Sequence, residues 1–130
     1  MDTPYLFHHM GTPTDEKRPN ERYSEHFKMC TSDHAGEFRI QFHRFEPDSP
    51  LHPMIKTKPH VALQVANLKE AVKGKTLLLG PYEPIPRYKV AIINDGGMPV
   101  ELIETYLTME ELWTRSNQQI DLQVNGLNEF

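Results

Sequence analysis

The sequence predicts an α+β domain in which strands outnumber helices and a strand, helix and strands pattern occurs twice. Eleven prolines and seven glycines in 130 residues interrupt helices and favour short strands joined by turns. The composition, 38% hydrophobic and 25% charged, is typical of a chain that buries a core. We expect one domain over residues 1–115, with modules at about 5–55 and 56–107 and a following helix, and a C-terminal tail at 116–130.

The first half of the chain predicts two strands separated by a helix. Residues 5–12 are short, largely apolar and stopped by a proline, as expected for a strand. Tyr23 and Phe27 have the i,i+4 spacing of one apolar stripe, which favours a modest helix starting near Pro19. Apolar and polar residues alternate over 38–43, which is the period of a strand with one face on a core.

The second half opens on a strand and a helix after a proline-rich loop at residues 46–53. Apolar and polar side chains alternate from residue 60 to residue 65, which again predicts a half-buried strand. Asn67 and Glu70 have the spacing of a capping box, and Gly74 is a suitable end for the short helix that they would start.

Three more strands and a second helix are expected beyond Gly74. The strands cover residues 76–79, 88–94 and 99–106. A hairpin turn at residues 95–97 joins the last two strands, because Asp-Gly-Gly suits the left-handed backbone of a tight turn. Thr108 and Glu111 form a further capping box, for a helix that carries Leu112 and Trp113.

The two halves match each other in the places of their polar residues. His9 and His60 each precede a candidate helix and lie 51 residues apart. Gln41 and Glu101 each lie late in their half and are 60 residues apart. Sequence identity between the halves is slight, so what repeats is the position of these polar residues relative to the expected strands and helices.

These four residues form the candidate functional constellation. Each lies on the face of its expected strand that is opposite to the apolar residues, as Glu101 does between Val100 and Leu102. Imidazole nitrogens together with carboxylate and amide oxygens suit a borderline or hard divalent cation. From the spacing alone, however, such side chains are more often the solvated polar lining of a half-buried sheet than metal ligands.

Other polar and aromatic residues have simpler interpretations. His43 shares a face with Gln41 and is expected to be a wall of the same cavity and not a ligand. Glu104 lies on the opposite face from Glu101, in an expected solvated or edge position. The remaining histidines in charged, turn-like or proline-rich surroundings are expected at the surface: His26, His34 and His52. Packing is favoured over substrate contact for Tyr82, Arg87 and Tyr88.

Charge and hydropathy argue against several classes of protein. The formal net charge of −4 offers no positive footprint for nucleic acid. No apolar run approaches the roughly 18 residues of a spanning helix, so no membrane segment is expected. The first residues do not resemble a secretory signal and a single cysteine cannot form an intrachain disulfide, which together favour a cytoplasmic location.

Two segments carry a resemblance to a known family. PHVALQVANLKEAVKGKTLLLGPYEPIPRYKVAIINDGGMPVELIET resembles the second βαβββ module of the glyoxalase/bleomycin-resistance/extradiol-dioxygenase superfamily, also called the vicinal oxygen chelate superfamily. The histidine-led strand, the short helix and the final ELIE strand after a glycine turn are its most specific features. LFHHMGTPT and FRIQFHRFEPDSP resemble the first and last strands of the first module, with His9 and Gln41 at ligand positions.

The resemblance implies two βαβββ modules that form a U-shaped, partly open barrel around a divalent ion. The ligands would be His9, Gln41, His60 and Glu101, and the ion zinc, nickel, cobalt, iron, manganese or magnesium. It implies a metal-dependent lyase, isomerase or epimerase that stabilises an enolate or oxyanion of a small oxygenated substrate, with Glu101 as ligand and base, in a homodimer. Gln41 stands where glutamate is common in the family, so a second carboxylate base is missing.

The competing class is a non-catalytic small-molecule binder, like the drug-sequestering members of the same superfamily, which hold ligands in a dimer cleft without a metal. Walls rich in aromatic residues would favour that class. Phe42 is expected on the core face and the ligand-type residues on the cleft face, which favours the metal-dependent enzyme.

Overall fold

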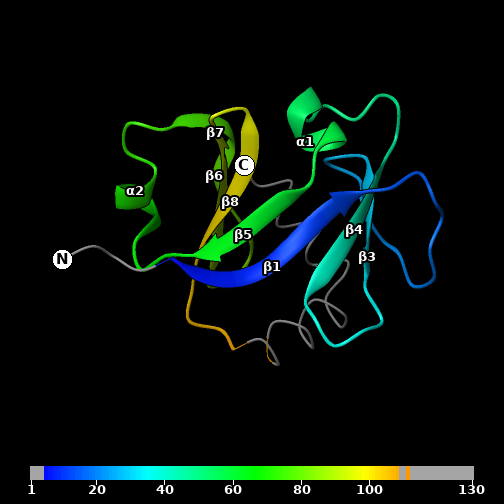
Figure 1. The fold of residues 1–130 in the computed structure, drawn as a ribbon, viewed down its shortest axis with the longest axis horizontal. Coiled ribbons are helices and arrows are strands. Elements are labelled where there is room, and N and C mark those ends of the chain that lie inside the picture. The colour runs from blue at the N-terminus through cyan, green and yellow to red at the C-terminus, as the bar shows by residue number, and fades with distance from the viewer. Residues whose placement is uncertain (1–4, 109–110, 112–130) are drawn as a thin grey trace.

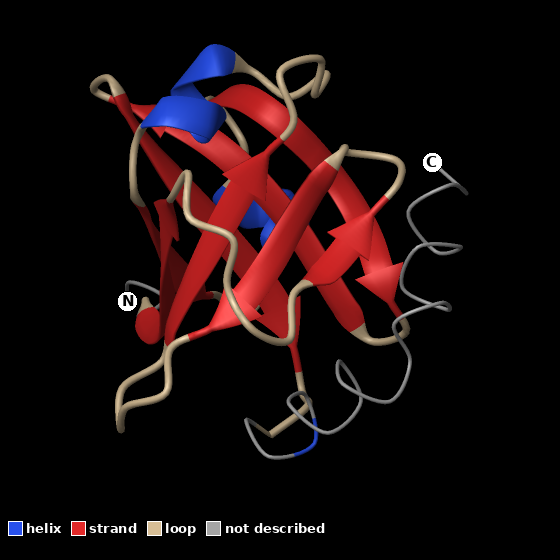
Figure 2. Cartoon of the chain, turned by 90° about the vertical axis from the view of Figure 1, so that its right-hand side faces the viewer, coloured by secondary structure: helices blue, strands red, loops and turns tan. Residues whose placement is uncertain are grey.

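The computed structural model describes residues 5–108 and residue 111, which form one strongly curved sheet with few helices (Figures 1 and 2). Its strands are β1 (Leu6–Pro13), β2 (Arg22–Ser24), β3 (Met29–Asp33), β4 (Ile40–Phe45), β5 (His60–Gln64), β6 (Thr76–Ile85), β7 (Tyr88–Asp95) and β8 (Met98–Thr105). The order across the eight-stranded sheet is β2-β3-β4-β1-β5-β8-β7-β6. The sheet is an open half-barrel, so the predicted α+β class is confirmed.

The strand pairing repeats between the halves. β1 pairs in parallel with β4, β5 pairs in parallel with β8, and antiparallel pairing of β1 with β5 joins the halves through the middle of the molecule (Figure 1). Gly11 is the register partner of Gln41, and Ala62 is the partner of Glu101. A shift of 51 residues takes Gly11 to Ala62 and a shift of 60 takes Gln41 to Glu101, so the spacings found in the sequence are spacings between equivalent strand positions.

The prediction of a helix near Pro19 is wrong. The segment instead forms β2, which pairs antiparallel with β3 and sets Tyr23 opposite Cys30. Tyr23 remains 41% exposed and donates to a carboxylate oxygen of Glu46 at 2.8 Å, whereas Phe27 is 8% exposed in an apolar cluster. The two rings therefore lie in different surroundings, one exposed and one buried, and their i,i+4 spacing does not reflect a shared helix face. None of the residues between β1 and β4, all of which the structure describes, is helical.

A short helix, α1 (Pro53–Thr57), begins where the sequence predicted only a loop. Pro53 occupies the first turn, where its missing N–H costs nothing, and the His52 side chain accepts from the backbone N–H of Met54 at 3.0 Å. Ile55 is buried with Phe27, so α1 anchors this side of the sheet's concave face.

The second helix, α2 (Leu68–Ala71), lies where the sequence predicted it and covers the outer face of the second half. Asn67 Oδ1 accepts from the Glu70 backbone N–H at 3.1 Å, as the capping pattern predicts. Glu104 lies on the face opposite to Glu101, as predicted, but it is half-buried and not fully solvated, and its Oε1 accepts from the Leu68 N–H at 2.7 Å. The apolar cluster under α2 contains Val65, Leu68, Ala91, Ile93 and Leu102.

The β7–β8 turn and the start of the C-terminal segment also follow the sequence patterns. Gly96 and Gly97 both have positive φ in the predicted hairpin turn. Thr108 and Glu111 exchange hydrogen bonds of 3.0 and 3.1 Å between backbone N–H groups and side chains, as a capping box requires. Leu112, Trp113 and the tail at 116–130 lie outside the described residues. Among the described residues, no helix has the length and apolar character needed to cross a membrane.

Candidate metal centre

β5 and β8 bring the first two residues of the site together. Their parallel register pairs Ala62 with Glu101, which leaves His60 on the same concave face of the sheet. His60 Nε2 lies 3.0 Å from Glu101 Oε1. The side chains are 8% and 12% exposed, so this contact is largely shielded from water.

β1 supplies His9 through an irregularity in its pairing with β5. The register shifts between Phe7 and His9, and as a result both His8 and His9 are buried although they are consecutive in a strand. His9 Nε2 lies 3.3 Å from Glu101 Oε1, and its Nδ1 lies 2.9 Å from His8 Nδ1. Three segments far apart in the sequence thus converge on one carboxylate oxygen.

The donor set of His9, His60 and Glu101 fits a divalent cation. One potential ligand atom from each residue lies within 4.8 Å of the other two. Two imidazoles and a carboxylate suit zinc and neighbouring transition metals better than magnesium, which prefers oxygen ligands. Burial alone would raise the pKa of Glu101, but hydrogen bonds with His60 and His9 outweigh burial and hold that pKa well below its ordinary value. The carboxylate is therefore ionised, as a ligand must be.

Gln41 lines the same cavity and is half-buried on β4. Its register position, paired with Gly11, is equivalent to that of Glu101, paired with Ala62. The structure therefore places all four residues predicted as ligands around one cavity of about 160 Å³.

His43 is a wall of this cavity, as the sequence predicts. It is 9% exposed, its Nδ1 lies 3.0 Å from Thr31 Oγ1, and its ring stacks on His60 at a centroid distance of 5.6 Å. Burial lowers the pKa of His43 to about 3, so the ring is neutral. A neutral ring can pack against His60 without adding charge to the site.

Gly11 allows these rings to approach the sheet. A Cβ atom at this position would lie 2.6 Å from His60 Nε2 and 2.9 Å from His43 Nε2. Any larger residue would displace the imidazole that faces Glu101, so a glycine in this strand serves close packing of the site.

The cavity-lining residues that sequence reasoning missed include three basic ones, namely His8, Arg22 and Arg39. Simple strand alternation places His8 opposite to His9, and no sequence signal reveals the shift in pairing that brings both inside. The cavity walls are also richer in aromatic residues than expected: they include Tyr23, Phe27, Phe45, Tyr82 and Tyr88.

The other residues considered from the sequence fall into two groups. His26, His34 and His52 are exposed, as predicted. Tyr82 and Tyr88 line the cavity as well as packing in the core, whereas Arg87 is exposed in the β6–β7 turn.

The paired four-stranded halves and the shared cavity define the chain's architecture as glyoxalase-like. Methylmalonyl-CoA epimerase from Mycobacterium tuberculosis is a solved structure with this similarity, at a TM-score of 0.54 and 14% sequence identity. The match covers 78% of this chain and 89% of the epimerase chain, and at this identity it shows the fold. No protein-family model and no curated protein sequence matches this chain.

Proposed function

We propose that this chain is a metal-dependent enzyme of the lyase, isomerase or epimerase type that acts on a small oxygenated substrate. The observation that carries the proposal is the convergence of His9 Nε2 and His60 Nε2 on Glu101 Oε1 inside a cavity. The similarity in fold to an epimerase supports it, because epimerisation removes and returns a proton at carbon.

The ligands in this proposal are His9, Gln41, His60 and Glu101. A divalent cation held there would act as a Lewis acid on substrate oxygens and stabilise an enolate or oxyanion. Glu101 is the residue that would move the proton, since it is ionised and its carboxylate lies in the cavity. The apolar walls exclude water, and this strengthens the electrostatic interactions among these residues.

Calorimetric titration with zinc, nickel, cobalt and manganese ions tests the metal site in wild type, His60→Ala and His26→Ala. We expect His60→Ala to weaken binding by about 100-fold or more, because an imidazole ligand is removed and neither neighbouring residue can replace it. His26 is exposed, so its replacement should leave the affinity unchanged. Binding that is absent in wild type, or equal in all three proteins, contradicts the proposal.

A non-catalytic binder is the second candidate, and the aromatic cavity walls favour it. In that case the contacts of Glu101 with His9 and His60 are structural hydrogen bonds that need no cation. Removal of metal with a chelator separates the two candidates: a binder keeps its affinity for apolar ligands, whereas the enzyme loses turnover. Homodimer formation and a cytoplasmic location stay predictions from the sequence.

A further inference from the structure

Three hydrogen-bond donors lie together in the cavity beside His9. They are His8 on β1, Arg39 directly before β4, and Tyr88 on β7, and all three line the cavity. The ring centroids of His8 and Tyr88 are 5.8 Å apart. The Arg39 carbonyl accepts from the Met10 N–H at 3.0 Å, which fixes the backbone of Arg39 beside β1. The positive charge of Arg39 acts on both His8 and Tyr88.

His8 is the member of this group that needs an explanation. His8 is 2% exposed, and its Nε2 atom has no hydrogen-bond partner among the described residues. Buried polar atoms are normally paired, so an unpaired one in a residue that lines a cavity points to a ligand that would complete it.

The bond between His8 and His9 decides which role Nε2 plays. This step rests on the proposed metal site: if His9 offers its Nε2 lone pair to a cation, its proton lies on Nδ1. That proton is then donated to His8 Nδ1 across the observed 2.9 Å, and His8 keeps its own proton on Nε2. His8 Nε2 is therefore a donor that requires an acceptor.

Arg39 adds a positive charge to the same place. A guanidinium, an imidazole N–H and a phenol O–H together match a planar acceptor with a negative charge, and a carboxylate has both properties.

We propose that His8, Arg39 and Tyr88 form a binding subsite for a carboxylate group of the substrate, next to the metal centre. The substrate is then a small carboxylic acid whose apolar part contacts walls such as Ile85 and Val90. The carboxylate accepts from Arg39 and from His8 Nε2, while the cation takes other oxygens of the same molecule.

Ligand titration followed by NMR tests this subsite, with acetate, butyrate and benzoate as probes and their neutral amides as controls. The protein is used both loaded with zinc and treated with a chelator. We expect at least one acid to bind about tenfold more tightly than its amide, because only the acid can pair with Arg39.

Single variants test the contribution of Arg39 and of His8 to acid binding separately. Arg39→Gln should remove the preference for the acid, Arg39→Lys should restore part of it, and His8→Leu should weaken acid binding by about fivefold. His8→Gln retains an N–H donor and should bind better than His8→Leu. Arg87→Gln removes the same charge from an exposed turn residue outside the cavity lining, and it should behave as wild type. Thermal unfolding shows which variants are folded.

The outcomes distinguish this inference from the proposed function. Suppose that wild type binds no metal but binds acids more tightly than their amides, and that Arg39→Gln removes this preference. The metal proposal then fails, whereas the carboxylate subsite is supported without the assignment of the His8 proton to Nε2. If wild type binds zinc but no acid binds better than its amide, the subsite is overturned. An equal loss in Arg87→Gln and Arg39→Gln also overturns it, because the effect is then one of net charge.

Discussion

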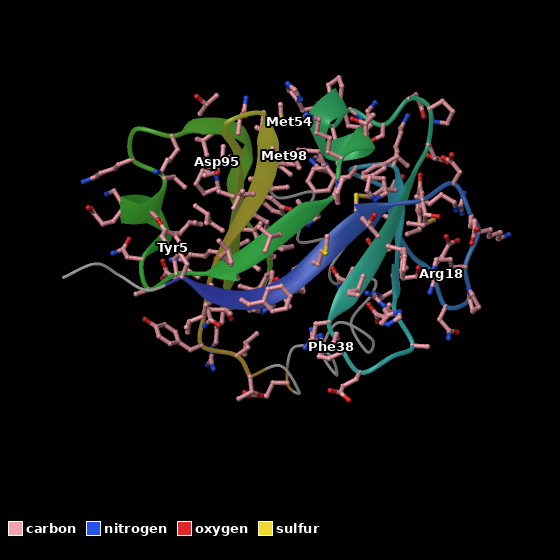
Figure 3. All side chains as sticks on the ribbon, in the orientation of Figure 1. Tyr5, Arg18, Phe38, Met54, Asp95 and Met98 are labelled. Atoms are coloured by element: carbon pink, nitrogen blue, oxygen red, sulfur yellow. The ribbon has the colours of Figure 1, made fainter. Side chains whose placement is uncertain are left out.

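The two halves of the sheet share their strand pairing and differ in what covers them. In the second half, α2 packs on the outer face, where Leu102 is 2% and Ala91 is 0% exposed. In the first half no described residue between β1 and β4 is helical, and Met10 on β1 is 41% exposed. Phe38, before β4, is 70% exposed and projects from the surface in Figure 3.

This difference shows that the sheet pairing does not depend on a covering helix. The first half contains ion pairs such as Arg22 with Asp33 at 2.9 Å and Arg44 with Glu21 at 2.8 Å, and its residues Phe27, Met29 and Phe45 pack in an apolar cluster. Both halves present their inner faces to one cavity, but among the described residues only the second half provides a carboxylate there, because Gln41 occupies the place equivalent to Glu101.

The largest expected effect is on stability and lies in the second half. Leu102→Ala should lower the free energy of unfolding by about 3 kcal/mol, since it opens a hole under α2. Phe42, at the equivalent place in β4, is half-buried beneath the Arg18 guanidinium at 3.9 Å, so Phe42→Ala should cost about 1 kcal/mol. Urea unfolding measures both, and equal losses would show that the first half is packed as well as the second.

A second comparison concerns the equivalent residues Gly11 and Ala62. Gly11→Ala should cost about 2 kcal/mol and weaken cation binding about tenfold, because the new methyl group displaces the His60 ring. Ala62→Gly should cost about 1 kcal/mol through backbone entropy and leave cation binding unchanged. Calorimetry with zinc measures the affinity of both variants, and urea unfolding measures their stability. An equal loss of zinc affinity in the two variants would contradict this prediction.

Acid sensitivity should come mainly from the first half, which contributes His8 and His43. Burial lowers their pKa values from 6.5 to about 4 and about 3. The unfolded chain therefore takes up these protons first, so stability is complete above pH 6.5 and is lost as the pH falls towards 4. In metal-free protein, His43→Gln should reduce the loss between pH 7 and 4.5 by about 1–2 kcal/mol. Parallel stability curves for wild type and variant would argue against this.

The smallest effect is expected from moving the carboxylate between halves. Gln41→Glu should tighten cation binding about tenfold but cost the metal-free protein about 1 kcal/mol, because two carboxylates then share the cavity. Glu101→Gln should weaken binding, and the double swap should recover it to within about tenfold of wild type. Calorimetry measures the cation affinity of the three variants. If the double variant binds the cation no more tightly than Glu101→Gln alone, the two halves are not equivalent at the site.

Sequence patterns predicted the second half well because its signals are local. Residues 60–65 alternate clearly, and Asn67 with Glu70 marks the start of α2 by a bond that these two residues make alone. They failed between Pro19 and Phe27, where β2 has three residues, too few to show a period. A single i,i+4 pair could not separate a helix from a hairpin whose partner strand lies further along the chain.

The sequence by itself determined the succession of strands and helix in the second half, the capping residues and the repeat that relates His9 to His60 and Gln41 to Glu101. It determined these because alternation, capping and spacing are properties of neighbouring residues. Tertiary structure alone decided that His8 joins His9 inside the cavity and that Arg39 and Tyr88 lie beside them. Those placements depend on the shifted pairing of β1 with β5 and on the curvature of the sheet, which arise from contacts between residues distant in sequence.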